Sequence, residues 1–144
     1  MADRVQDNID IEATAEEIFE VATDFEAYPD WNSNIKDVRI EETDEEGYAT
    51  KVWFEVDAKI KVVRYTLEYD YSNAPDSFSW NLVEGDVKAL NGSYAFDEFD
   101  DVTEVVYETS LDPGFPVPSF LKKQGEKQIV KGALADLKKR VESR

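Results

Sequence analysis

Residues 65–71 read Tyr65-Thr66-Leu67-Glu68-Tyr69-Asp70-Tyr71, with a large apolar or aromatic side chain at every second position. Successive side chains of a β-strand point to opposite faces of a sheet, so this alternation predicts a strand with one apolar and one polar face. The same spacing recurs in the segments that follow. It places further aromatic side chains at Phe78, Trp80, Tyr94, Phe96 and Tyr107.

The alternation extends over most of the chain and predicts six consecutive strands. The first runs from residue 35 to the acidic turn at 43–47, and the others cover residues 48–58, 62–72, 77–84, 87–99 and 102–111. The segments between them are short and rich in Asp, Asn, Gly and Pro. Turns this short connect antiparallel neighbours, so the six strands form a meander.

Helical patterns and one further strand flank the meander. Residues 5–11 alternate as a first strand, and the capping box of Thr14 and Glu17 opens a helix at residues 15–24. Pro29 interrupts residues 25–32, which predicts a turn or a broken second helix. Residues 119–142 form a final helix. Its C-terminal half carries an apolar stripe at Val130, Ala133, Leu134, Leu137 and Val141.

The composition excludes several classes of function. The chain has 144 residues, which suits one domain spanning 1–144, and a net charge of -17, which disfavours binding to nucleic acids. It contains no cysteine and no histidine. Thiol catalysis, Ser-His-Asp relays and His- or Cys-ligated zinc are therefore excluded. The acidic clusters lack the spacing of an EF-hand loop, so we expect neither a metal nor a cofactor.

Targeting signals are not evident in the sequence. No apolar run approaches the ~20 residues of a membrane span, and the first residues lack the basic-then-apolar form of a signal peptide. We therefore expect a cytoplasmic protein without stable membrane insertion, either a monomer or a weak homodimer.

Two segments resemble a known superfamily. Residues 18–31, which include Tyr28-Pro29-Asp30-Trp31, resemble the opening of START-like (SRPBCC) proteins, a superfamily that includes polyketide cyclases/dehydrases and coenzyme Q-binding proteins. Residues 132–142 are similar to the ending of small cyclase-like proteins of actinobacteria. The resemblance implies an α+β helix-grip (START/Bet v 1-like) fold, in which a curved antiparallel sheet of about seven strands wraps around the long C-terminal helix.

The aromatic stripe is the candidate binding surface. Val, Ile and Leu would suffice for a face that only packs the core, and they need no hydrogen-bond partner, whereas each buried phenol does. The predicted ligand-binding residues are Phe54, Tyr65, Tyr69, Trp80, Tyr94, Tyr107 and Gln128, and the predicted pocket rim consists of Tyr28, Trp31 and Phe115. The alternative is that these side chains only pack the core. No catalytic residue is predicted.

Two glycines in the final helix help to decide whether the aromatic stripe binds a ligand or only packs the core. Gly125 and Gly132 lie seven residues apart near one helix face, with Gln128 between them. A glycine inside a helix is unfavourable by ~1 kcal/mol relative to alanine, so something compensates. Either the sheet packs closely against the glycines or, as we favour, they leave space for a ligand.

These patterns favour the binding or transport of a hydrophobic small molecule, such as a lipid, an isoprenoid or an aromatic polyketide, between the sheet and the C-terminal helix. One alternative is a polyketide cyclase or dehydratase that acts by substrate positioning and tyrosine hydrogen bonding. An enzyme of this kind would have an ionisable side chain on the inward face of the sheet. Glu55, Arg64 and Glu68 instead alternate onto the outward face, which weakens this alternative. A protein-interaction module is a third possibility.

Overall fold

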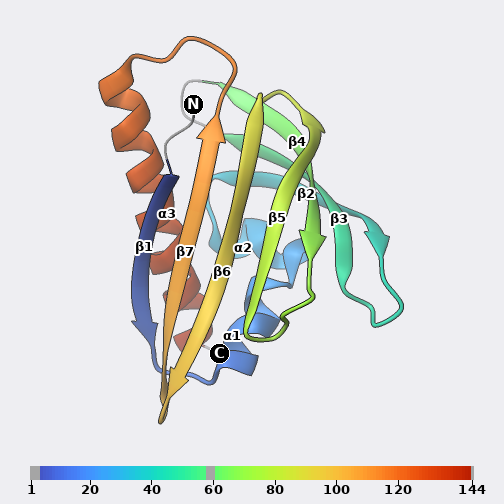
Figure 1. The fold of residues 1–144 in the computed structure, drawn as a ribbon, viewed down its shortest axis with the longest axis vertical. Helices are drawn as coiled ribbons and strands as arrows, with labels where there is room; N and C mark the ends of the chain where they lie inside the picture. The colour runs from blue at the N-terminus through green and yellow to red at the C-terminus, as the bar shows by residue number, and fades with distance from the viewer. Residues whose placement is uncertain (1–3, 58–60, 144) are drawn as a thin grey trace.

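The computed structural model describes residues 4–57 and 61–143 and, within these ranges, the side chains of all residues except 119–126. A strongly curved antiparallel sheet holds the helices on its concave side (Figure 1). The strands are β1 (Arg4–Ile11), β2 (Ile35–Thr43), β3 (Ala49–Asp57), β4 (Val62–Asp70), β5 (Ser77–Gly85), β6 (Ala89–Phe99) and β7 (Val102–Asp112). The helices are α1 (Ala15–Ala22), the 3-10 helix η1 (Phe25–Ala27), α2 (Tyr28–Trp31) and α3 (Ser119–Glu142).

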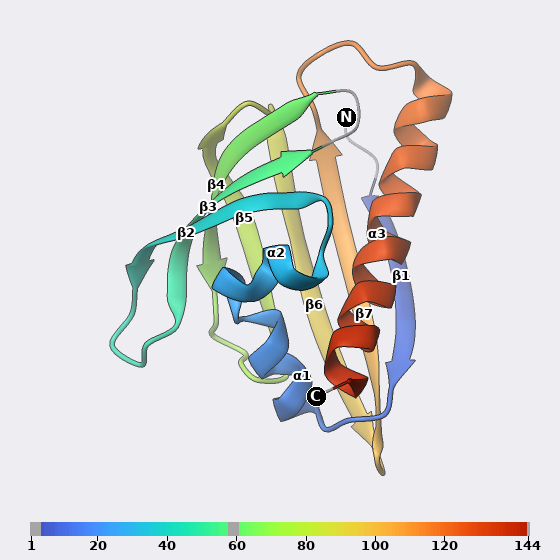
Figure 2. The ribbon, with the colours of Figure 1, turned by 180° about the vertical axis from the view of Figure 1, so that it is seen from behind.

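The sheet has the strand order β1-β7-β6-β5-β4-β3-β2. Consecutive strands from β2 to β7 are neighbours, and β1 joins the far edge by pairing with β7. Figure 2 shows the sheet curling around the helices, with α3 beside β1. The predicted meander and the predicted α+β class, with a curved sheet around the C-terminal helix, are confirmed.

Several element boundaries differ from the predictions by one or two residues. α1 ends at Ala22 and Thr23 is its C-cap; the Thr23 backbone N–H and, at 2.8 Å, its hydroxyl both donate to the Phe19 carbonyl. The segment that follows is the predicted broken helix, with Pro29 in the first turn of α2, where a missing N–H group costs little. β6 begins at Ala89, after a turn, and the predicted strand end at residue 58 lies outside the described residues.

The C-terminal half of α3 closes one end of the concave face. It packs against β1, β7 and α1, and its buried stripe consists of Val130, Leu134, Leu137 and Val141. Polar contacts fasten it to the first strand, since Lys138 Nζ donates to the Asp10 carbonyl at 2.7 Å. Within the described ranges, none of the helices has the length and apolar character required to cross a bilayer.

Candidate functional site: an aromatic wall on the concave face

Six of the predicted ligand-binding residues lie on neighbouring strands and share the concave face. We call this set the aromatic wall: Phe54, Tyr65, Tyr69, Trp80, Tyr94 and Tyr107. The strand register brings them together as direct cross-strand neighbours. The pairs are Phe54 with Tyr65, Tyr69 with Trp80, and Tyr94 with Tyr107. The period-two alternation therefore predicted the shared face, whereas the register found in the structure determines the partners.

Ring contacts connect the aromatic wall into one surface. Trp80 lies at its centre, with ring centroids 5.7 Å from Tyr69, 5.5 Å from Tyr94 and 5.8 Å from Tyr107. Phe25 of η1 joins the other end, at 4.7 Å from Tyr69 and 6.2 Å from Phe54. Tilted and edge-on geometries of this kind are the favourable ones for aromatic pairs. The wall is therefore continuous across the sheet.

A glycine on the adjacent strand allows the indole of Trp80 to lie close to the backbone. Gly92 is the cross-strand partner of Trp80, and a Cβ atom built on it would meet the Trp80 ring and the Glu108 carbonyl at 2.7 Å. Real Cβ atoms do not approach so closely. Only glycine fits beneath this ring in its present position.

The hydroxyl groups of the wall differ from those at its edges. The Tyr71 hydroxyl donates to the Ala49 carbonyl at 2.6 Å, and the Tyr28 hydroxyl donates to the Ala22 carbonyl. The hydroxyls of Tyr65, Tyr69 and Tyr94 form no hydrogen bond in the part of the chain that the structure describes, and these oxygens are not fully enclosed either. They therefore face space that a water-sized group can reach.

Burial keeps these phenols neutral. It is the main cause that raises the pKa of Tyr65, Tyr69 and Tyr94 above the ordinary value, and the nearby Tyr107 raises each of them further. Burial also raises the pKa of Tyr107 to about 12, although a hydrogen bond with Thr109 acts in the opposite direction. At neutral pH every hydroxyl of the wall is an uncharged donor and acceptor.

The described interior contains no buried charge. Its buried polar residues are threonines, namely Thr66, Thr103 and Thr109. Glu55 and Arg64 pair with each other at 2.8 Å on the opposite face of the sheet, as the parity predicted. Among the residues that the structure describes, no set of acidic side chains converges as a metal-binding group.

The predicted rim residues lie at two places. Tyr28 and Trp31 of α2 stack edge-on at 5.0 Å, and Tyr28 reaches the wall at 6.2 Å from Phe54. Phe115 lies in the loop before α3, where the ammonium group of Lys61 sits 4.7 Å from its ring. The Lys61–Phe115 contact joins the loop before α3 to the segment that precedes β4. The Nε1 atom of Trp31 is fully enclosed and has no hydrogen-bond partner among the described residues.

The structure does not bring Gln128 to the aromatic wall. Its side chain is exposed, and a Cβ atom added to Gly132 would meet nothing within 4 Å. Gly132 lies two residues beyond the buried Val130, about 200° around the helix axis, and so faces away from the core. The expected space between helix and sheet therefore does not arise at Gly132, and the side chain surroundings of Gly125 lie outside the described residues.

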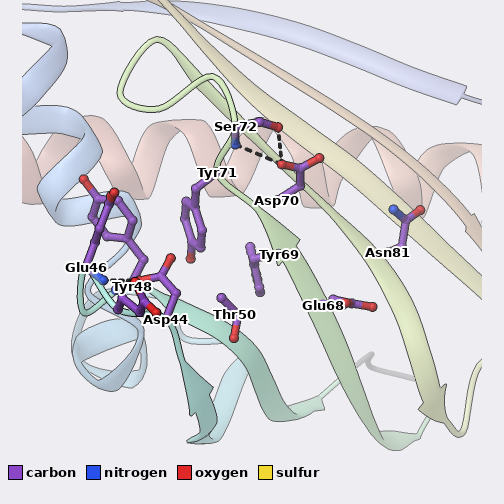
Figure 3. A pocket seen from close by; sticks show the side chains of 11 residues that line it. Asp44, Glu46, Tyr48, Thr50, Glu68, Tyr69, Asp70, Tyr71, Ser72 and Asn81 are labelled. Atoms are coloured by element: carbon purple, nitrogen blue, oxygen red, sulfur yellow. Dashed lines mark hydrogen bonds between the residues drawn. The ribbon is translucent and has the colours of Figure 1, made fainter.

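An acidic depression that was not anticipated lies on the outer surface. It has a volume of about 700 Å³ and is open to solvent. Figure 3 shows Asp44, Glu46 and Tyr48 at one end and Glu68 and Asn81 at the other. It forms where the first residues of β3 diverge from β4, because their pairing begins only at Lys51 and Glu68. Its carboxylates make it unsuitable for an apolar ligand.

The sequence matches one known protein family over most of its length. A model described as "Polyketide cyclase / dehydrase and lipid transport" matches residues 11–138. The chain belongs to this family. Among curated proteins the sequence has no significant match.

Solved structures with the same fold cover nearly the whole chain. A START superfamily protein from Mycobacterium smegmatis is 23% identical, with a TM-score of 0.88 and 97% of each chain covered. The Zhui aromatase/cyclase from Streptomyces sp. R1128 is 18% identical, with a TM-score of 0.81, 100% of this chain and 96% of the other covered. A STAR-related lipid transfer protein from Xanthomonas axonopodis is 16% identical, with a TM-score of 0.78, 96% of this chain and 85% of the other covered. The START-like assignment made from the sequence is thereby confirmed.

Proposed function

We propose that this protein binds a hydrophobic small molecule against the aromatic wall, between the sheet and α3. One observation carries the proposal. The hydroxyls of Tyr65, Tyr69 and Tyr94 lie in the interior without a hydrogen-bond partner among the residues that the structure describes, yet they are not sealed off. Because a water-sized group can reach these oxygens, the space beside them can hold either water or a polar atom of a ligand, and three such hydroxyls on one wall favour a site that is completed by another molecule.

The composition of the wall suits an apolar ligand with a few polar atoms. Tyr69, Trp80 and Tyr94 are only 8%, 6% and 6% exposed, so protein already covers most of each ring and a ligand would contact the remaining surface. Apolar burial stabilises such a complex by roughly 25 cal/mol per Å² before the cost of association is subtracted. The free hydroxyls would then orient the ligand through hydrogen bonds.

The comparisons support this proposal at the level of the family. The description of the matching family includes lipid transport, and one structural neighbour is named as a lipid transfer protein. Candidate ligands are lipids, isoprenoids and aromatic polyketides. The predicted roles of Tyr28, Trp31 and Phe115 at the entrance are part of the same proposal.

A second function, cyclisation or dehydration of a polyketide, has its own support. The family description includes polyketide cyclases and dehydrases, and one neighbour is named as an aromatase/cyclase. A neutral tyrosine hydroxyl can polarise a carbonyl group, and a rigid wall can hold a flexible chain in a reactive conformation. The described interior offers no buried carboxylate or amine for proton transfer, which favours binding over catalysis.

Native mass spectrometry of the protein purified from its own host tests the proposal. We expect a bound molecule of defined mass that is lost on denaturation. Trp80→Ala should abolish the retained mass, whereas Trp53→Phe on the outer face should preserve it. An interior volume below roughly 300 Å³ in an experimental structure, combined with an empty protein in the mass spectrum, would refute the binding function.

A test for the enzyme compares the mass of the retained molecule with that of a supplied polyketide. A product that differs by loss of water would favour the dehydratase, whereas recovery of the unchanged compound would favour the carrier.

A further inference from the structure

The concave face is filled at one end and less covered at the other. α1 lies at the end where β4 finishes and β5 begins, and the loop before α3 lies at the opposite end (Figure 2). The inward side chains of Leu67, Phe78 and Val105, at the α1 end, are buried. Those of Leu82 and Leu90, toward the opposite end, are only half-buried. A ligand lying against the aromatic wall therefore has access from the end at the loop before α3.

Three aromatic side chains close the α1 end. We call them the aromatic plug: Phe19 of α1, Tyr71 just after β4, and Phe78 of β5. Phe19 meets the other two rings edge-on, with centroids 6.4 Å from Tyr71 and 5.6 Å from Phe78. Phe78 joins the plug to the wall, at 5.8 Å from Trp80 and 5.6 Å from Tyr94. A chain that follows the wall away from the opening therefore meets the plug.

The plug is less polar than the wall. The Tyr71 hydroxyl already donates to the Ala49 carbonyl at 2.6 Å, and the rings of Phe19 and Phe78 carry no polar atom. The free hydroxyls belong to the wall. Because burying a polar group without a partner is unfavourable, the apolar end of a ligand faces the plug and its polar end faces the wall hydroxyls or the opening.

We propose that the aromatic plug limits the length of the apolar chain that the protein binds, and that Phe19 sets this limit. The inference rests on the proposed function and adds a limit on ligand size. Leu82 and Phe78 are four residues apart on β5, which at ~3.4 Å per residue spans roughly 13 Å, the length of an extended chain of about ten carbons. Phe19 is then a residue that determines specificity, because it supports Tyr71 and Phe78 from the side of α1.

The experiment compares primary n-alcohols from hexanol to tetradecanol, with affinity measured by tryptophan fluorescence. In the unmodified protein each added methylene should strengthen binding about fourfold until the chain meets the plug, at roughly ten carbons. Further carbons should give no gain. The reference probe is 2-acetylnaphthalene, a compact molecule that can lie against the wall without a chain that reaches the plug.

Variants assign the limit to one side chain. Phe19→Ala should raise the limit by about three methylenes, the length of the ring that is removed, so that tridecanol binds at least about tenfold more tightly than it binds the unmodified protein. Phe19→Leu removes less volume and should raise the limit by about one methylene, and it serves if the alanine variant does not fold. Affinity for 2-acetylnaphthalene should stay the same in both.

Leu137→Ala is the matched control. Leu137 is fully buried on α3, so its loss also removes core volume and lowers stability. The length limit should nevertheless stay where it is. Near-UV circular dichroism checks that each variant retains its packed core.

The possible failures are distinguishable. If affinity rises through tetradecanol in the unmodified protein, or if the Phe19 variants leave the limit unchanged, the inference is overturned. The same holds if Leu137→Ala moves the limit as far as Phe19→Ala does. In each of these cases binding of 2-acetylnaphthalene shows that the proposed pocket stands. If neither the alcohols nor 2-acetylnaphthalene bind, the binding function itself fails and the inference fails with it.

Discussion

Two pairs of tyrosines on the concave side of the sheet differ in what their hydroxyl groups contact. Tyr28 and Tyr71, the anchored pair, donate to backbone carbonyls. Tyr69 and Tyr94, the free pair, donate to no group in the described part of the chain. Burial is the main cause that raises the pKa of all four. Burial therefore does not separate the pairs, whereas access to a backbone acceptor does.

The difference shows how one residue type serves two purposes on one face. Tyr71 ties the end of β4 to the start of β3 at a point where these strands no longer pair, and Tyr28 ties α2 to the last turn of α1. The anchored hydroxyls stabilise the relative positions of these strands and helices. The free hydroxyls keep their hydrogen-bonding capacity for another molecule.

The largest expected effect comes from alkaline pH, which ionises both pairs and so removes the distinction between them. The folded-state pKa values lie above the unfolded value of about 10, so the neutral phenols stabilise the protein below pH 10. That stability is lost as pH rises through the folded-state values, which include about 12 for Tyr107. Absorbance at 295 nm should rise late and together with loss of circular dichroism. A gradual rise near pH 10 in a folded protein would contradict the burial of the phenols.

The next largest effect is expected for Trp80→Ala, which removes the centre of the wall between the two pairs. Loss of a large buried aromatic side chain should lower the free energy of unfolding by ~3–5 kcal/mol, measured by urea denaturation. Gly92→Ala provides the matched test from the opposite strand. It should cost about 1–3 kcal/mol by forcing the indole out of position, and a neutral result would show that the ring lies elsewhere.

A smaller effect is expected when an anchor is removed. Tyr71→Phe leaves the Ala49 carbonyl without its donor and should lower the free energy of unfolding by about 0.5–1.5 kcal/mol. Affinity for 2-acetylnaphthalene, measured by tryptophan fluorescence, should not change. Weaker binding without a loss of stability would reverse the roles of the two pairs.

The smallest effect on stability is expected for the free pair. Tyr69→Phe and Tyr94→Phe remove hydroxyls that contact no described protein group, so the free energy of unfolding should change by less than about 0.5 kcal/mol. The affinity for 2-acetylnaphthalene should nevertheless fall. Tyr71→Phe, in which this affinity should not change, is the control. If both variants lower only stability, the aromatic wall is simply core.

Much of the fold was predictable because strand alternation is a local signal. The parity that begins at Tyr65 placed Tyr69, Trp80 and Tyr94 on one face, and antiparallel pairing then made them neighbours. The bounds of α3 were predicted from the proline-rich segment that precedes it and from its apolar stripe. The start of β6 was misplaced by two residues because the turn before it is fixed by distant carbonyls, such as that of Asp112 bonded to Lys88 N–H.

The candidate site was predictable only in part. Alternation identifies a face, but it does not show which hydroxyls find acceptors. The bond from Tyr71 to Ala49 spans 22 residues and depends on how two strands diverge. Gln128 was misjudged for a related reason. Its half of the helix lacks an apolar stripe, so the sequence offered no reference for the inward direction, and the side chain is exposed.

The pairing of β1 (Arg4–Ile11) with β7 (Val102–Asp112) also constrains how the protein is made. β1 leaves the ribosome before its partner β7 has been made, and the backbone N–H of Glu12 must likewise wait for Glu142, whose carboxylate accepts it at 3.0 Å. Such long sequence separations slow folding. β1 can therefore join the sheet only after β7 has been synthesised, and until then its unpaired edge is exposed and chaperones can recognise it.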